Sequence, residues 1–174
     1  FASGEGAGDY REGTDYDKRD DWNWDNWGSD DHNRCRRSTS SYADRIYSGN
    51  DFQGGLTMVS CSGALLGADV GGEDFEDEGA IYQDNPKHTG EAPQIDALDE
   101  ETSLVTMSIG GNDVGFASVL MDCMINGQRG IPGFRCQEKW DDELGDRIED
   151  LRPQLVELYR DMQERAPNAR IVIM

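Results

Sequence analysis

Hydrophobic and polar positions divide the second half of the chain into strand-like and helix-like segments. Short runs rich in β-branched and apolar residues occupy 103–109 and 170–174 and are typical of buried strands. Between them, residues 113–125 predict a helix with one apolar side, formed by Val114, Ala117, Leu120, Met121 and Met124. A longer amphipathic helix follows, because apolar residues recur at intervals of three and four: Trp140, Leu144, Ile148, Leu151, Leu155, Leu158 and Met162. Pro153 lies inside that helix and predicts a kink or a restart.

Weaker patterns predict further elements in the first half of the chain. Residues 38–48 carry apolar side chains at helical spacing after a Ser/Thr cap. The run 56–61 predicts a short buried strand, and the small residues of 64–68 predict a helix after it. Residues 93–98 predict one or two helical turns that begin at a proline. Strands that alternate with helices predict an α/β fold with a parallel sheet.

Two of the predicted strands end in glycine-containing turns that precede a helix. One turn is Cys61-Ser-Gly-Ala64, and the other is Gly110-Gly-Asn-Asp113. The carboxyl ends of parallel strands share the edge of the sheet where ligands bind in open α/β folds. Backbone amides at such turns bind developing negative charge, so two amides and the Asn112 side chain would make an oxyanion hole. The alternative is that the glycines serve only to turn the chain.

The net charge of the chain and the length of its apolar runs argue against some classes of binding partner. The 174 residues include 36 acidic and 16 basic side chains, which gives a formal net charge of −20. This charge repels phosphate backbones and argues against a nucleic-acid partner, and we interpret it as a device for solubility. No apolar run approaches the ~20 residues that a membrane-spanning helix requires. Phe1 is not a start methionine and the strand at 170–174 stops without a turn, so we expect both ends to be truncated.

Four cysteines are present, and four cysteines allow three disulfide connectivities. Cys123 and Cys136 flank a Gly/Pro-rich excursion at 126–133, which a local Cys123–Cys136 bridge would close. That pairing leaves Cys35 with Cys61. An even number of cysteines favours an oxidising environment, and therefore a secreted, extracellular protein. The alternative is four reduced, buried thiols in a cytosolic protein.

An acidic, tryptophan-rich segment covers residues 15–31. Its aspartates are spaced as in a calcium loop, but the central glycine and the terminal glutamate of an EF-hand are not in place. No Cys-x-x-Cys pair is present, and His32 and His88 are not near a ligand cluster, so we predict no metal and no cofactor. Three tryptophans beside a cleft would suit an acyl- or sugar-binding surface. A solvated loop with tryptophans folded back on the body is the interpretation we prefer.

Three blocks of the sequence resemble, in order and spacing, those of the SGNH (GDSL-type) esterase/lipase superfamily. The blocks are Phe1-Ala-Ser-Gly-Glu-Gly-Ala7, Cys61-Ser-Gly-Ala64 and Ile109-Gly-Gly-Asn-Asp113. Residues 33–38 and 165–172 also resemble the secreted, disulfide-bonded branch of that superfamily. The resemblance spans essentially the whole chain and implies a single, partial SGNH hydrolase domain over residues 1–174. The implied fold is a flavodoxin-like three-layer α/β/α fold with a parallel sheet, here without its first strand and its C-terminal catalytic block.

The resemblance also implies a reaction, which is acyl transfer through a serine ester. Gly63 N–H and the Asn112 side-chain amide would form the oxyanion hole for a small-molecule, lipid or acylated-carbohydrate ester. The nucleophile would precede Phe1, and the histidine block of the family would lie beyond the end of this chain. Ser3 matches the small residue after the nucleophile and Ser62 has no partnered base in the sequence, so neither is assigned as nucleophile. The alternative is a non-catalytic, secreted SGNH-like domain that binds carbohydrate or a surface.

Overall fold

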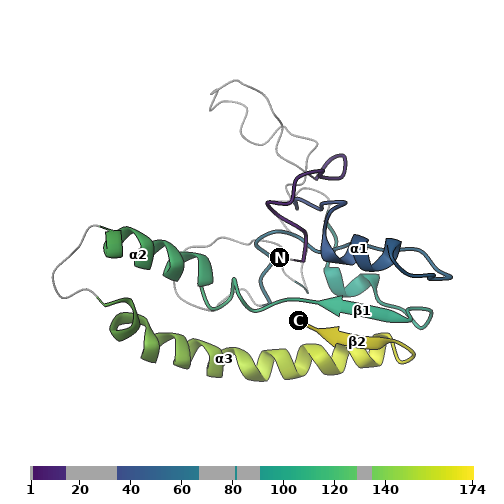
Figure 1. Ribbon diagram of the computed structural model, residues 1–174. Coiled ribbons are helices and arrows are strands. Elements are labelled where there is room, and N and C mark those ends of the chain that lie inside the picture. Colours follow the sequence, from purple (N-terminus) through teal and green to yellow (C-terminus); the bar gives the residue numbers. More distant parts are fainter. Residues whose placement is uncertain (1, 15–34, 67–80, 82–90, 129–134) are drawn as a thin grey trace, which may run out of the picture.

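The computed structural model describes residues 2–14, 35–66, 81, 91–128 and 135–174 (Figure 1). Within these ranges the regular elements are α1 (Tyr42–Ser48), the 3₁₀ helix η2 (Gln94–Ala97), β1 (Leu104–Met107), α2 (Phe116–Gln128), α3 (Cys136–Arg165) and β2 (Arg170–Ile173). The predicted helix over 38–48 and the predicted turns over 93–98 are therefore confirmed as the shorter elements α1 and η2. Ser41 caps α1, since its side chain accepts a hydrogen bond from the Asp44 amide.

Strands β1 and β2 form a parallel pair, which confirms an α/β fold with a small parallel sheet. The register pairs Leu104 with Arg170 and Met107 with Ile173. Two backbone hydrogen bonds extend the ladder beyond the strands: Arg170 N to Ser103 O (2.9 Å) and Met174 N to Met107 O (2.9 Å). Figure 1 shows α3 running along one side of this sheet, as the last part of the crossover that makes the strands parallel.

The core lies between the C-terminal half of α3 and the sheet. Leu151, Leu158 and Met162 are the buried residues of α3, and Leu158 is fully buried. Leu66, Ile81 and Ile95 complete the buried cluster, and partly buried residues of both strands pack against it: Val105, Met107 and Ile171. The apolar spacing predicted α3 correctly, but its N-terminal half does not reach this core. Ile148, for example, is 56% exposed.

Pro153 does not interrupt α3, so the predicted restart is wrong. The helix runs without a break from Cys136 to Arg165 (Figure 1). A proline in a helix interior costs about 3 kcal/mol relative to alanine, because it removes one backbone hydrogen bond. Pro153 and Glu149, whose carbonyl loses that bond, both lie on the exposed side of α3, so the carbonyl is accessible to solvent. Burial of Leu151 and Leu158 on the opposite side holds the helix together across the proline.

Helix α2 differs from its prediction in its start and in its apolar side. It begins at Phe116 rather than Asp113, because Gly115 has a φ of +73°, a left-handed conformation that a helix cannot contain. Three residues of the predicted apolar side are exposed: Leu120 is 48% exposed, Met121 61% and Met124 54%. The reason is that α2 packs beside the N-terminal half of α3 and away from the core cluster.

Residues 56–61 do not form the predicted strand, and residues 64–66 do not form the start of a helix. A strand requires a partner for its backbone groups. No strand lies beside 56–61 in the part of the chain that the structure describes, and its backbone carbonyls at Val59 and Ser60 bond to the Arg37 side chain instead. The rest of the predicted helix, residues 67 and 68, lies outside the described ranges.

Two disulfides connect parts of the fold that are separated in sequence, and they are the two expected pairs. Cys35–Cys61 joins the segment before α1 to the residue that opens the first glycine turn, and Cys35 is fully buried. Cys123–Cys136 joins α2 to the first residue of α3. Both cysteine pairs therefore fix the position of an element that no strand pairing holds.

A carboxylate on α2 reinforces the Cys123–Cys136 connection. Asp122 accepts hydrogen bonds from the Lys139 ammonium (2.7 Å) and the Trp140 indole (2.9 Å) on α3. The Lys139 hydrogen bond is the main reason that the pKa of Asp122 is lowered from its ordinary value of 3.8.

This lowered pKa predicts an acid-sensitive contact between α2 and α3. A carboxyl whose pKa is lower in the folded state contributes stability above its unfolded pKa, and loses it as the pH falls through the folded pKa. The contact is therefore expected to persist above pH 3.8 and to loosen below it. The NMR shift of the Trp140 indole N–H would follow this titration, and Asp122→Asn should abolish it. An indole shift that stays constant in the unmodified chain down to unfolding would contradict the prediction.

Candidate functional site

The turn between β1 and α2 is built on two glycines with left-handed backbones. Gly110 has a φ of +99° and Gly115 a φ of +73°. A Cβ on Gly110 would lie 3.0 Å from the Leu151 side chain, and a Cβ on Gly115 would lie 2.6 Å from the Arg147 guanidinium. Both positions therefore favour glycine because of their left-handed conformation, and any other residue would also displace the end of a neighbouring side chain. Backbone hydrogen bonds from Val114 N to Gly110 O (3.1 Å) and from Phe116 N to Gly111 O (2.9 Å) close the turn.

Asn112 and Asp113 are presented by this turn toward the segment after Gly63. The Asn112 Nδ2 group donates to the Ala64 carbonyl at 3.0 Å. Asp113 is 1% exposed, and its Oδ1 accepts from the Leu66 amide at 2.6 Å. Two adjacent side chains thus fix a segment almost fifty residues earlier in the sequence. Because an asparagine amide carries two N–H groups, the bond to Ala64 orients the group and engages only one of them.

Gly63 lies in a turn whose two sides are held independently. Its φ of +81° is again left-handed, so the chain changes direction at this glycine. On one side the Ala64 amide donates to Cys61 O (3.3 Å), and on the other the Ser62 amide donates to Cys35 O (3.1 Å). The Cys35–Cys61 disulfide ties the same two segments together. The structure therefore brings together the two predicted site residues, with Asn112 bonded to the residue that follows Gly63.

The two serines considered in the sequence have different surroundings. Ser3 is 2% exposed and lies in a turn, where its carbonyl accepts from the Ser38 amide at 2.8 Å. Its burial fits a structural role. Ser62 donates its hydroxyl to the Glu5 carboxylate, and Glu5 is ion-paired with Arg36. This Ser62–Glu5 contact was not predicted from the sequence, and it ties the Gly63 turn to the turn at the start of the chain.

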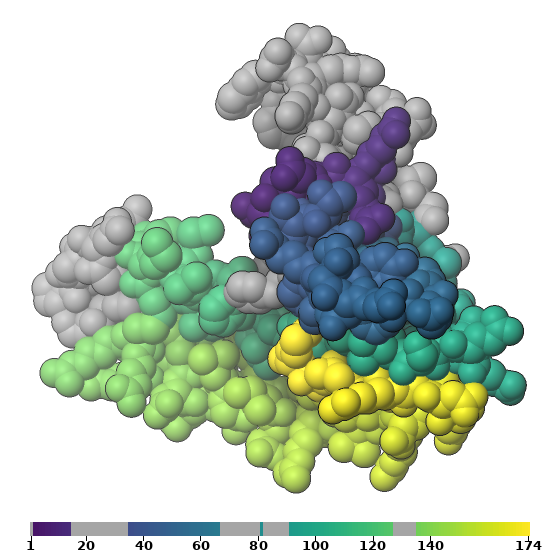
Figure 2. Space-filling view, turned by 45° about the vertical axis from the view of Figure 1, so that its right-hand side comes forward, coloured from purple at the N-terminus to yellow at the C-terminus, as the bar shows by residue number. Residues whose placement is uncertain are grey.

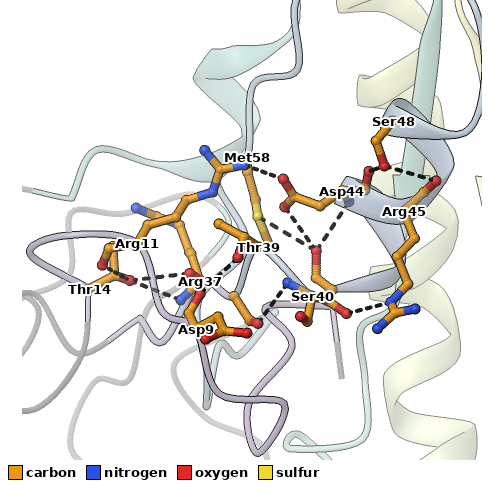
Figure 3. Close-up of polar contacts among 12 residues, drawn as sticks. Asp9, Arg11, Thr14, Arg37, Thr39, Ser40, Asp44, Arg45, Ser48 and Met58 are labelled. Atoms are coloured by element: carbon orange, nitrogen blue, oxygen red, sulfur yellow. Dashed lines mark hydrogen bonds and ion pairs between the residues drawn. The ribbon is translucent and has the colours of Figure 1, made fainter.

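Segment 35–38 is a further part of the site, and no role there was predicted for it beyond the Cys35–Cys61 pairing. Figure 3 shows Arg37 among the polar side chains of residues 9–14, beside the start of α1. The segment bonds to residues on both sides of the site, and Figure 2 shows the N-terminal residues, in purple, directly against this blue part of the chain. Two signals in the sequence point to this segment: residues 33–38 resemble the secreted SGNH branch, and three arginines in 34–37 stand out in a chain with a net charge of −20.

Several residues singled out in the sequence cannot be placed. His32, His88 and the tryptophan-rich segment 15–31 lie outside the described residues. Among the residues that are described, no cluster of His, Cys, Asp or Glu is arranged to hold a metal ion. None of the helices in those same ranges is long and apolar enough to cross a membrane.

Known proteins share sequence with this chain. It is 32% identical over 146 residues to Lipase 2 of Streptomyces coelicolor. It is 26% identical over 140 residues to a lipase of Streptomyces rimosus, and 25% identical over 141 residues to Lipase 1 of Streptomyces coelicolor. Each alignment covers 80% of this chain, but only 43%, 42% and 42% of the respective relative. The chain thus spans less than half the length of the curated relatives it matches.

No protein-family model matches the chain, and no solved structure matches it. All three relatives are named as lipases, so their similarity points to a lipase or esterase family.

Proposed function

We propose that this chain is the oxyanion-binding part of a secreted serine ester hydrolase of the SGNH type. The observation that supports this most directly is the contact between the Asn112 amide and the turn that carries Gly63, across 48 residues of sequence. In the proposed site, one side-chain N–H of Asn112 and the backbone N–H of Gly63 converge on the oxyanion. The similarity to three Streptomyces lipases supplies the reaction class, which is hydrolysis of a carboxylic ester.

In the proposed mechanism the residues of this chain stabilise charge rather than transfer protons. A serine attacks the ester carbonyl after a histidine removes its proton, and the carbonyl oxygen becomes an oxyanion. Gly63 N–H and the second N–H of Asn112 donate to that oxyanion. Neither donor moves during the reaction. The bond from Asn112 to Ala64 O holds the side chain, and the bond from the Ser62 amide to Cys35 O holds the turn that carries Gly63. Such preorganised donors stabilise the oxyanion more than water molecules would, because water must reorient as the charge develops.

For the full-length protein we propose an SGNH-type fold and secretion. The parallel β1–β2 pair with α3 across it is consistent with part of a three-layer α/β/α fold of the SGNH type. The two disulfides favour an oxidising environment, and thus secretion. The non-catalytic alternative relied on the tryptophans of segment 15–31. That segment lies outside the described residues, so no structural observation favours the alternative.

Hydrolysis of short-chain p-nitrophenyl esters tests this proposal. A full-length protein that contains this chain is expected to release nitrophenol at a rate well above buffer, and to lose that activity when treated with a serine-reactive phosphonate. The 174-residue chain alone is expected to be inactive, because the resemblance places the nucleophile and the histidine outside it. Rapid hydrolysis by the chain alone would contradict the assignment of the nucleophile. A full-length protein without esterase activity would refute the function.

A further inference from the structure

We propose that Arg37 is a positioning residue for the oxyanion turn, and this inference rests on the proposed function. Its guanidinium bonds to both backbone carbonyls that immediately precede Cys61. Arg37 Nε donates to Ser60 O at 2.9 Å, and Nη2 donates to Val59 O at 3.2 Å. The segment that leads into Gly63 has no strand partner among the described residues, so this side chain takes the place of a neighbouring strand.

The Arg37 guanidinium is itself held in place by Glu91. Nη1 donates to Glu91 Oε1 at 2.9 Å, and Nη2 donates to the other carboxylate oxygen, which makes a bidentate pair. The side chains of Arg37 and Glu91 are only 11% and 19% exposed. A planar guanidinium presents its donors in a fixed fork, so the Glu91 carboxylate sets the plane in which Val59 and Ser60 are bound. A lysine at position 37 would keep the charge but could not make this set of bonds.

The backbone of segment 35–38 also bonds to the N-terminal residues, which lie on the other side of the site. The Arg11 amide donates to Arg37 O at 2.7 Å, and the Ser38 amide donates to Ser3 O at 2.8 Å. In the proposed enzyme, Ser3 lies in the turn that follows the nucleophile. Cys35 is bonded to Cys61 on the opposite side. Segment 35–38 therefore links the nucleophile turn to the oxyanion turn, and the Arg37 side chain bonds to the residues that lead into the oxyanion turn.

The test compares Arg37→Lys with Arg45→Lys in the full-length protein. Arg45 is an exposed arginine on α1 whose Nε donates to the local Ser40 carbonyl at 3.1 Å, and it is the matched control. Arg37→Lys is expected to lower kcat by roughly 10- to 100-fold, since a shift of about 1 Å in a catalytic donor has an effect of that order. KM should change by less than about threefold, because the oxyanion forms only in the transition state. Arg45→Lys should leave both constants unchanged.

A second measurement separates positioning from a general loss of stability. Hydrogen exchange of the Ser62 amide, which donates to Cys35 O at 3.1 Å, should be faster in Arg37→Lys than in the unmodified protein. Exchange of core amides in α3 should not change at the same temperature. Glu91→Gln keeps an acceptor for the guanidinium but removes the charge. It is the milder variant. If Arg37→Lys does not fold, the same kinetic and hydrogen-exchange measurements are made on Glu91→Gln, with the same changes expected.

Asn112→Ala, measured in parallel, distinguishes failure of this inference from failure of the proposed function. If Asn112→Ala lowers kcat and Arg37→Lys does not, the function stands and the positioning role of Arg37 is wrong. If Arg37→Lys raises KM and lowers kcat in proportion to a general rise in exchange, Arg37 is only structural and the inference is overturned. If Asn112→Ala leaves kcat unchanged, the oxyanion assignment and the inference built on it both fall.

Discussion

Replacing Asn112 with alanine is expected to lower kcat of the full-length protein by roughly 10²–10³-fold, the usual effect of removing one oxyanion donor. The substitution removes the side-chain N–H proposed to bind the oxyanion. It also removes the 3.0 Å bond to Ala64 O, which holds the Gly63 turn against the turn after β1. The measurement is the steady-state rate of hydrolysis of a p-nitrophenyl ester, with kcat and KM determined separately. KM should change little, because the donor acts on charge that is absent from the bound ester.

Asn168 provides a matched control for this experiment. Its Nδ2 group also donates to a backbone carbonyl, that of Glu100 at 2.9 Å, and both asparagines are exposed. Asn168 lies in the connection between α3 and β2, away from the glycine turns. Asn168→Ala should therefore leave kcat unchanged, although it loses a bond of the same kind. Equal, small effects of the two substitutions would show that Asn112 has only a structural role.

Removing the Cys35–Cys61 disulfide, as Cys35→Ala/Cys61→Ala, is expected to lower the free energy of unfolding by about 3.5 kcal/mol. This value is the loop-closure entropy for a bridge that spans 26 residues, with the native state left unstrained. The same variant should lower kcat, because Cys61 opens the turn that presents Gly63. Unfolding in urea gives the first quantity, and ester hydrolysis far below the unfolding midpoint gives the second.

The other disulfide separates these two effects. Cys123→Ala/Cys136→Ala removes a bridge that spans 13 residues, so the expected loss is about 3 kcal/mol, only slightly smaller. This bridge joins α2 to α3 and does not touch either glycine turn. It should therefore destabilise the protein without lowering kcat of the folded fraction. If both double variants lowered kcat equally, stability alone would explain the result and the role of Cys61 at the site would be refuted.

The elements that could be predicted from the sequence are those whose own pattern determines their environment. In α3, apolar residues at helical spacing from Leu151 to Met162 face the core, and the β-branched run at 170–173 pairs in a parallel sheet. Residues 56–61 have a similar apolar pattern but form no strand, because a strand depends on a partner elsewhere in the chain. The apolar side of α2 is exposed for a related reason: periodicity identifies a face but not what packs against it.

In the candidate site, too, some residues could be predicted from the sequence and others could not. Asn112 and Gly63 could be proposed from the sequence, because each lies in a glycine-containing turn after a predicted strand and in a block that resembles the SGNH superfamily. Only the turn of Asn112 follows a strand in the structure. Arg37 could not, since its role comes from bonds to Ser60 and Glu91, at sequence distances of 23 and 54 residues. Asp113 was likewise read as the first residue of a helix. Its carboxylate instead turns inward to the Leu66 amide.

The exposed apolar residues of α2 also affect whether the protein self-associates in solution. Met121 and Met124 are more than half exposed, and at the end of β2, seen in yellow in Figure 2, Met174 is 55% exposed. Surfaces of this kind associate with each other unless something keeps molecules apart. Here the net charge of −20 supplies a mutual repulsion between chains. That repulsion disappears near the isoelectric point of about 4.2 and shortens to a range of about 8 Å at physiological salt. The protein should thus stay dispersed in dilute neutral buffer and self-associate as the pH falls towards the isoelectric point.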